Sequence, residues 1–180
     1  MKFLFLITII SFFFINTDLS DQIDLAGSNK SEIKKALRKV SKDEYEGMVF
    51  LIKNMPSEDL KTLKSDFLLE NSRLAYKAWR QSPWHDDIPK PIFFNYILPY
   101  ANLNEKRELW RKTLQKSSLS IIENSKTISE AVVALNHNLF KEFGVIYSTN
   151  RPKADQSPSE SIKAGMASCT GLSILLIDAC

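Results

Sequence analysis

The chain has 180 residues, of which 44% are hydrophobic and 25% are charged, a composition typical of a folded domain with a buried core and unlike that of a disordered chain. Its formal net charge of +3 is too small to indicate a nucleic-acid partner, and we interpret the basic residues between positions 30 and 42 as a solvated helix face. Only five glycines are present, and five of the seven prolines fall at 83–91 and 152–158, which favours long uninterrupted helices. We therefore expect a mainly α-helical protein.

The N-terminal segment is typical of a secretory signal. Met1 and Lys2 are followed by an apolar run at positions 3–15, which is shorter than the ~20 residues that a membrane span needs. We expect a signal peptide at about residues 1–20, cleavage between Ser20 and Gly27, and export to the periplasm or the outside of the cell. Two alternative interpretations are open. The segment could stay uncleaved and anchor the chain in a membrane, or it could form a buried core helix.

The next part of the chain predicts a series of short helices. Apolar spacing indicates helices at 31–40, at 41–54 behind a capping box at Ser41, from Ser57 onward, and at 66–81. Residues 84–91 are expected to form a proline-punctuated loop, and 92–98 a compact aromatic helix. The aromatic residues expected in the core there are Phe93, Phe94, Tyr96 and Tyr100.

Residues 104–164 predict three further helices and one strand. Asn104 is the expected N-cap of a helix that runs to Ile122, and the segment 127–130 is a capping box for a helix that ends at Gly144. Residues 145–147 are the one credible strand. The segment 157–160 combines a capping box with proline at the first helical position, which predicts a short helix to about residue 164.

Cys169 is the candidate catalytic residue. It opens an apolar helix, Ser168 can cap that helix, and Gly165 and Gly171 leave room for a substrate to approach. A helix N-terminus favours the thiolate, which is the nucleophilic form of cysteine. The helix face expected to be buried consists of Leu172, Leu175, Leu176 and Ala179. The alternative interpretation is an inert, buried cysteine that acts as a small hydrophobic residue.

The two cysteines are not expected to bond to each other. Cys169 and Cys180 lie eleven positions apart on one expected helix, which places their Cα atoms about 16 Å apart, well beyond the reach of a disulfide. The cysteines and the two histidines also match no metal-ligand spacing, so we expect neither a metal nor a cofactor.

The run from Lys163 to Cys180 resembles the nucleophile segment of the transglutaminase-like superfamily, a papain-related group with a Cys-His-Asp triad. The upstream order of a helix, a short strand with tyrosine and a loop, at 127–157, is similar to that family as well. The resemblance implies an exported protein with a signal at 1–20, a helical N-terminal region at 21–126 and the first part of an α+β core at 127–180.

The resemblance further implies thiol acyl transfer, as a transglutaminase, a peptidase or a deamidase, on a protein or peptide substrate. Cys169 would attack a glutamine carboxamide or a peptide carbonyl, and its own N–H would contribute to an oxyanion hole. The family's histidine and aspartate would lie beyond residue 180, so we expect the 180-residue fragment to be inactive. His85 beside Asp86 offers a base and an orienting group, but nothing in the sequence ties it to Cys169, and we interpret His137 as solvated. The alternative function is a non-catalytic exported helical binding module in which Cys169 is buried.

Overall fold

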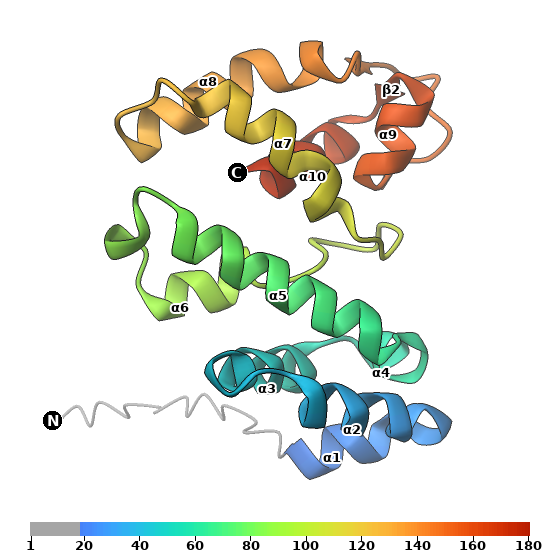
Figure 1. Cartoon of the computed structure of the whole chain (residues 1–180). Helices are drawn as coiled ribbons and strands as arrows, with labels where there is room; N and C mark the ends of the chain where they lie inside the picture. The colour runs from blue at the N-terminus through green and yellow to red at the C-terminus, as the bar shows by residue number, and fades with distance from the viewer. Residues whose placement is uncertain (1–18) are drawn as a thin grey trace, which may run out of the picture.

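The structure is a computed structural model, and it describes residues 19–180. It is mainly helical, which confirms the expected class. The α-helices are α1 (Leu19–Leu25), α2 (Lys30–Lys39), α3 (Tyr45–Asn54), α4 (Ser57–Thr62), α5 (Ser65–Gln81), α6 (Lys90–Ile92), α7 (Trp110–Ile122), α8 (Ile128–Glu142), α9 (Pro158–Ala164) and α10 (Cys169–Ala179). Helices α1 to α4 lie at one end of the molecule, α5 and α6 in the middle, and α7 to α10 at the other end (Figure 1).

The first hydrophobic core joins α1 to α5 with residues 93–101, which follow α6. Phe93 is fully buried and stacks on Trp79 of α5 with ring centroids 4.2 Å apart, while the edge of Tyr76 meets Phe93 at 4.7 Å. Burial of such aromatic side chains contributes most of the stabilising area of a small core. This cluster therefore fixes the turn after α6 against α5.

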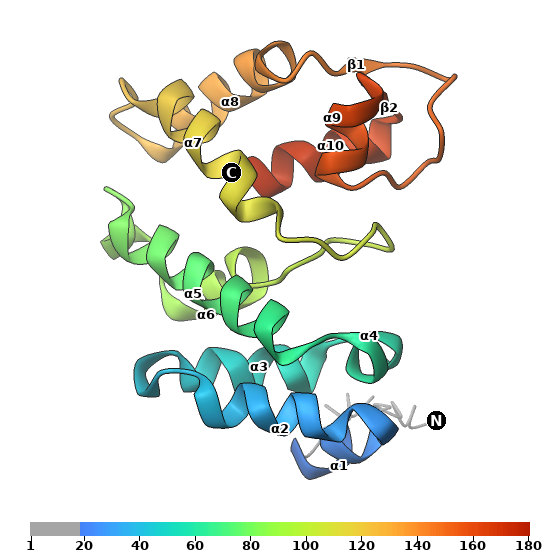
Figure 2. The same cartoon turned by 45° about the vertical axis from the view of Figure 1, so that its right-hand side comes forward.

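The second core joins α7, α8 and α10. Its buried members include Trp110 and Leu114 of α7, Leu135 and Leu139 of α8, and Leu175 of α10. The last residue of the first core is Ala101 and the first residue of the second is Trp110, so α7 belongs to the second core together with α8 and α10. Figure 2 shows α7 beside α8 and α10 from a second direction.

A short parallel sheet lies beside the start of α10. Strand β1 (Ile146–Tyr147) pairs with β2 (Met166–Ala167), with Ile146 opposite Met166 and Tyr147 opposite Ala167. The pattern at 145–147 predicted the first strand. The second strand was missed because two residues between helices carry no period of their own and become a strand only through their partner.

Three local predictions about the first two thirds of the chain are wrong. The Ser41 side chain makes no capping bond, because the N–H of Glu44 donates to the carbonyl oxygen of Ser41 at 3.1 Å. The Glu44 carboxylate that would complete the box is buried and accepts from Ser72 at 3.4 Å. Tyr96 is 74% exposed, because residues 93–97 form a π-helical turn that shifts the helical phase and points Phe93 and Phe94 inward in its place.

Asn104 is not the N-cap of α7, which begins six residues later at Trp110. The Glu105 carboxylate accepts from the backbone N–H groups of Asn102 at 2.6 Å and Leu103 at 2.8 Å. Arg107 donates from Nη1 to the carbonyl oxygens of Leu103 and Glu105. These side chains pair the backbone N–H and C=O groups of the turn, so those groups have hydrogen-bond partners without a helix.

The expected signal peptide lies almost entirely outside the described residues, which begin at Leu19. The expected cleavage region, 20–27, falls in α1 and the turn after it, where Ala26 is fully buried. Between residues 19 and 180 the structure contains no helix with the length and apolar character that crossing a bilayer requires.

Candidate functional site around Cys169

Cys169 is the first residue of α10, as predicted. Ser168 is the N-cap, and its Oγ accepts from the N–H of Gly171 at 3.1 Å. The predicted apolar face is also present: Leu175 is fully buried, and Leu172, Leu176 and Ala179 pack on the second core. The helix is therefore held by its buried face, while its first residue stays at the surface.

The loop before α9 is tied to the start of α10. Ser168 donates a hydrogen bond from Oγ to the carbonyl oxygen of Ala154, so one hydroxyl both caps the helix and holds the loop. On the other side, Ser148 donates from its N–H to the carbonyl oxygen of Ala167 at 2.9 Å. The residues that flank Cys169 are thus fixed by backbone contacts from two other segments.

Two residues set the closeness of this packing. A Cβ at Gly171 would lie 3.0 Å from the Cβ of Ala167, so glycine lets α10 approach β2. Gln156, which is 1% exposed, donates from Nε2 to the carbonyl oxygen of Met166 at 3.0 Å. The burial of Gln156 was not expected, because it lies in a polar stretch typical of a loop.

The Cys169 residue is exposed, which contradicts the alternative interpretation of a buried, inert cysteine. The first N–H groups of a helix have no acceptor within the helix. Ser168 Oγ accepts from the N–H of Gly171, and within residues 19–180 the N–H groups of Cys169 and Thr170 donate to no acceptor. An accessible thiol therefore stands beside two backbone donors that are free to meet an oxyanion.

Neither histidine is joined to Cys169 by a hydrogen bond in the described region. His85 packs against Trp79 of α5 with ring centroids 4.7 Å apart, in the first core. His137 lines a shallow, exposed depression on α8 together with Val133 and Asn138, in agreement with the solvated interpretation. Cys180 is a free thiol at the other end of α10 from Cys169, as the helical spacing predicts.

No family model, curated protein or solved structure matches the chain. The resemblance of residues 163–180 to the transglutaminase-like superfamily therefore stays a prediction. Among residues 19–180, no group of three or more histidine, cysteine, aspartate or glutamate side chains is placed to hold a metal ion.

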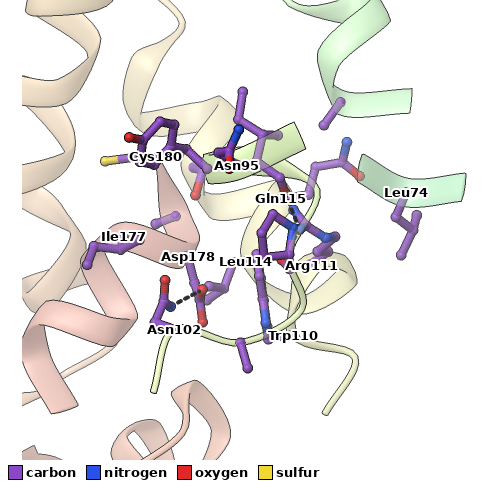
Figure 3. Close-up of a pocket in the computed structure, with 17 residues that line it drawn as sticks. Leu74, Asn95, Asn102, Trp110, Arg111, Leu114, Gln115, Ile177, Asp178 and Cys180 are labelled. Carbon is purple, nitrogen blue, oxygen red and sulfur yellow. Dashed lines mark hydrogen bonds between the residues drawn. The ribbon is translucent and has the colours of Figure 1, made fainter. Parts of the chain in front are cut away.

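The sequence did not indicate Arg111 and Asp178, which line a cavity at the far end of α10 from Cys169 (Figure 3). Asp178 is the one charged residue between Leu172 and Cys180, whereas Arg111 has Glu108 and Lys112 close by in the sequence. A lone charge inside an apolar run could have indicated Asp178, because burying an unpaired charge is costly, but no such feature marks Arg111.

Proposed function

We propose that Cys169 is the nucleophile of a transglutaminase-like thiol acyl-transfer protein that acts on a protein or peptide substrate. The observation that carries this proposal is the exposed thiol at the first position of α10, beside the unused N–H groups of Cys169 and Thr170. The short β1–β2 pair and the anchored loop at 148–157 support it, because they give the nucleophile a rigid surround.

The proposed chemistry passes through a thioester. The Cys169 Sγ attacks the carbonyl carbon of a glutamine carboxamide, and the negative charge that develops on the carbonyl oxygen is met by the Cys169 N–H. The carbon–nitrogen bond then breaks and ammonia leaves with the proton that the thiol gave up. Attack by an amine, or by water, on the thioester releases the product and restores the thiol.

The described residues supply the nucleophile and the oxyanion donors of this scheme but no histidine that contacts the thiol. Removal of the thiol proton is thus left without a positioned base. We expect the 180-residue chain to form an acyl-enzyme with an activated ester and not to turn over a glutamine peptide.

Acylation by p-nitrophenyl acetate tests the proposal. The expected result is a burst of p-nitrophenolate and an acetyl group mapped to Cys169 by peptide mass spectrometry, both lost in Cys169→Ala. Acetylation that is slow, or that falls on Cys180 alone, would overturn the proposal. Turnover of a glutamine peptide that disappears in Cys169→Ala would instead overturn the expectation of inactivity.

A matched thiol on the same helix isolates the effect of position. Ser173 is exposed one turn beyond Cys169, where the backbone N–H groups are used within the helix. In the Cys169→Ala background, Ser173→Cys therefore supplies an accessible thiol without the helix N-terminus. We expect iodoacetamide at about pH 6 to alkylate Cys169 about tenfold faster than this control thiol. Equal rates would show that the start of α10 does not activate its cysteine.

A further inference from the structure

A cavity of about 400 Å³ lies where the last turn of α10 meets α5, α7 and the segment after the π-helical turn. Its volume is within the range of small-molecule sites. Figure 3 shows Asn102 and Asp178 bonded to each other at one side of this cavity and Arg111 at another. The apolar side chains that line it include Leu74, Ile97, Trp110, Leu114 and Ile177.

Asp178 presents an unpartnered carboxylate oxygen. Its Oδ1 accepts from Nδ2 of Asn102 at 2.8 Å, but its Oδ2 is buried and has no hydrogen-bond partner. Buried carboxylate oxygens are normally hydrogen-bonded, because leaving one unpaired forfeits the water that it bound in the unfolded chain. Asp178, which lines the cavity, therefore has a carboxylate oxygen that the described residues do not use.

Arg111 presents unused donors to the same cavity. Its Nε donates to Oδ1 of Asn71 at 2.9 Å, and its Nη2 donates to the carbonyl oxygens of Pro99, at 2.6 Å, and of Ile97. Within residues 19–180 its Nη1 donates to no group, and the guanidinium carbon lies 4.2 Å from the centroid of the Trp110 ring. Two opposite charges thus line one cavity, each anchored by neighbours and each with an unused hydrogen-bonding atom.

We propose that this cavity binds a free α-amino acid with an apolar side chain. The ammonium group of the ligand donates to Oδ2 of Asp178, its carboxylate accepts from Nη1 of Arg111, and its side chain packs on Leu114 and Trp110. This site lies nine residues along α10 from Cys169, about 14 Å at helical rise, so the proposal does not depend on acyl transfer.

The charge pattern selects a zwitterion over a simple ion. A cation alone would meet the guanidinium of Arg111, and an anion alone would meet the carboxylate of Asp178, whereas an amino acid compensates both. The titration of the two groups agrees with this. Burial raises the pKa of Asp178 to about 7, and burial lowers the pKa of Arg111 to about 10, so each charge is desolvated without enough compensation.

Other charged groups also act on Asp178. The hydrogen bond from Asn102 and the charge of Arg111 lower its pKa, while the carboxylates of Glu105 and Glu108 raise it. Cys180 lines the same cavity. A ligand ammonium bound to Oδ2 adds a second cation beside Asp178, so binding requires the ionised form of Asp178 and favours it.

Calorimetric titration of the 180-residue chain with L-leucine tests the proposal. At about pH 8 we expect leucine to bind, and we expect N-acetyl-leucine, which lacks the ammonium, and leucinamide, which lacks the carboxylate, to bind about tenfold more weakly or worse. Absence of leucine binding by the folded chain, or equal binding of the three compounds, would overturn the proposal.

The pH dependence and two variants locate the site. Leucine affinity should fall about tenfold between about pH 8 and pH 6, because the carboxyl of Asp178 takes up a proton. Asp178→Asn should weaken binding and remove this dependence, while Asp86→Asn, at an exposed carboxylate outside the cavity, should change neither. Cys169→Ala should bind leucine normally, which separates this site from the thiol. If Asp178→Asn does not fold, as judged by circular dichroism, the three-compound comparison decides.

Discussion

The Nε of Arg107 donates to both carboxylate oxygens of Asp59, at 3.0 Å from Oδ2 and 3.2 Å from Oδ1. The contact joins the turn at 102–107 to α4, and the Tyr100 hydroxyl donates to the same Oδ2 at 2.9 Å. Both partners are largely buried, with side chains 17% and 10% exposed. This contact fixes the turn that leads from the first core into α7.

Loss of the Asp59 carboxylate should destabilise the chain. We expect Asp59→Ala to lower the free energy of unfolding by about 3 kcal/mol, because the guanidinium of Arg107 is left buried without its partner. Glu58→Ala, which removes a neighbouring carboxylate from an exposed pair with Lys61, should cost less than about 0.5 kcal/mol. Urea denaturation of the two variants measures the difference, and equal midpoints would show that the buried contact adds nothing.

Gly47 should resist substitution by alanine. A Cβ there would lie 2.6 Å from Oη and 2.8 Å from Cε2 of Tyr76, whose ring is buried between α3 and α5. We expect Gly47→Ala to cost about 2 kcal/mol through displacement of this ring. Glu46→Ala, at an exposed position on the same helix, serves as the control. Stabilisation by the ~1 kcal/mol that alanine gains over glycine in an open helix would contradict the clash.

Ser168 should matter for stability through its hydroxyl. Ser168→Ala leaves the N–H of Gly171 and the carbonyl oxygen of Ala154 without their partner, so we expect a loss of about 1 kcal/mol or more. Ser173→Ala, at an exposed position inside α10, should be close to neutral. Thermal unfolding of the two variants side by side measures the contribution of the cap. A similar effect of both would mean that Ser168 contributes no more than an ordinary surface serine.

The stability of the free chain should depend on the ionisation of Asp178. Burial raises the pKa of Asp178 to about 7 in the folded chain, from an ordinary value of 3.8. The folded chain therefore binds this proton more tightly than the unfolded chain does, so the contribution is complete below about pH 4 and is lost as the pH rises toward 7.

We expect the wild type to lose at least about 1 kcal/mol of stability relative to Asp178→Asn between these pH values, since asparagine does not titrate. Urea denaturation of both proteins across this range, without added ligand, measures the difference. A difference in unfolding free energy that stays constant with pH would contradict a raised pKa of the Asp178 carboxyl.

The sequence predicted the features that depend on neighbours along the chain. The capping box at 157–160 is present, and Thr127 caps α8 by accepting from the N–H of Glu130 at 3.2 Å. Ser168 caps α10 in the same way. These contacts join residues three positions apart, so their geometry follows from the local sequence once a helix forms.

The Thr127 box is nevertheless only half formed, because the Glu130 carboxylate accepts from the N–H of Lys126 at 2.7 Å and not from Thr127. Similar local patterns failed at Ser41 and Asn104, where the side chains next to the expected cap also make contacts with distant residues. Glu44 accepts a hydrogen bond from Ser72, and Arg107 donates one to Asp59. A capping bond is worth about 1 kcal/mol, so a buried tertiary contact can outweigh it.

By itself, then, the sequence determined the helical class, most helix positions and the placement of Cys169 at the start of an apolar helix, because periodicity and caps act over a few residues. Only the tertiary structure decided that the Cys169 residue is exposed, that Tyr96 faces solvent and that β2 exists. It alone joined Asn102 to Asp178 across 76 positions and set Arg111 in the same cavity. Such contacts depend on how two cores pack together, and no local pattern encodes that packing.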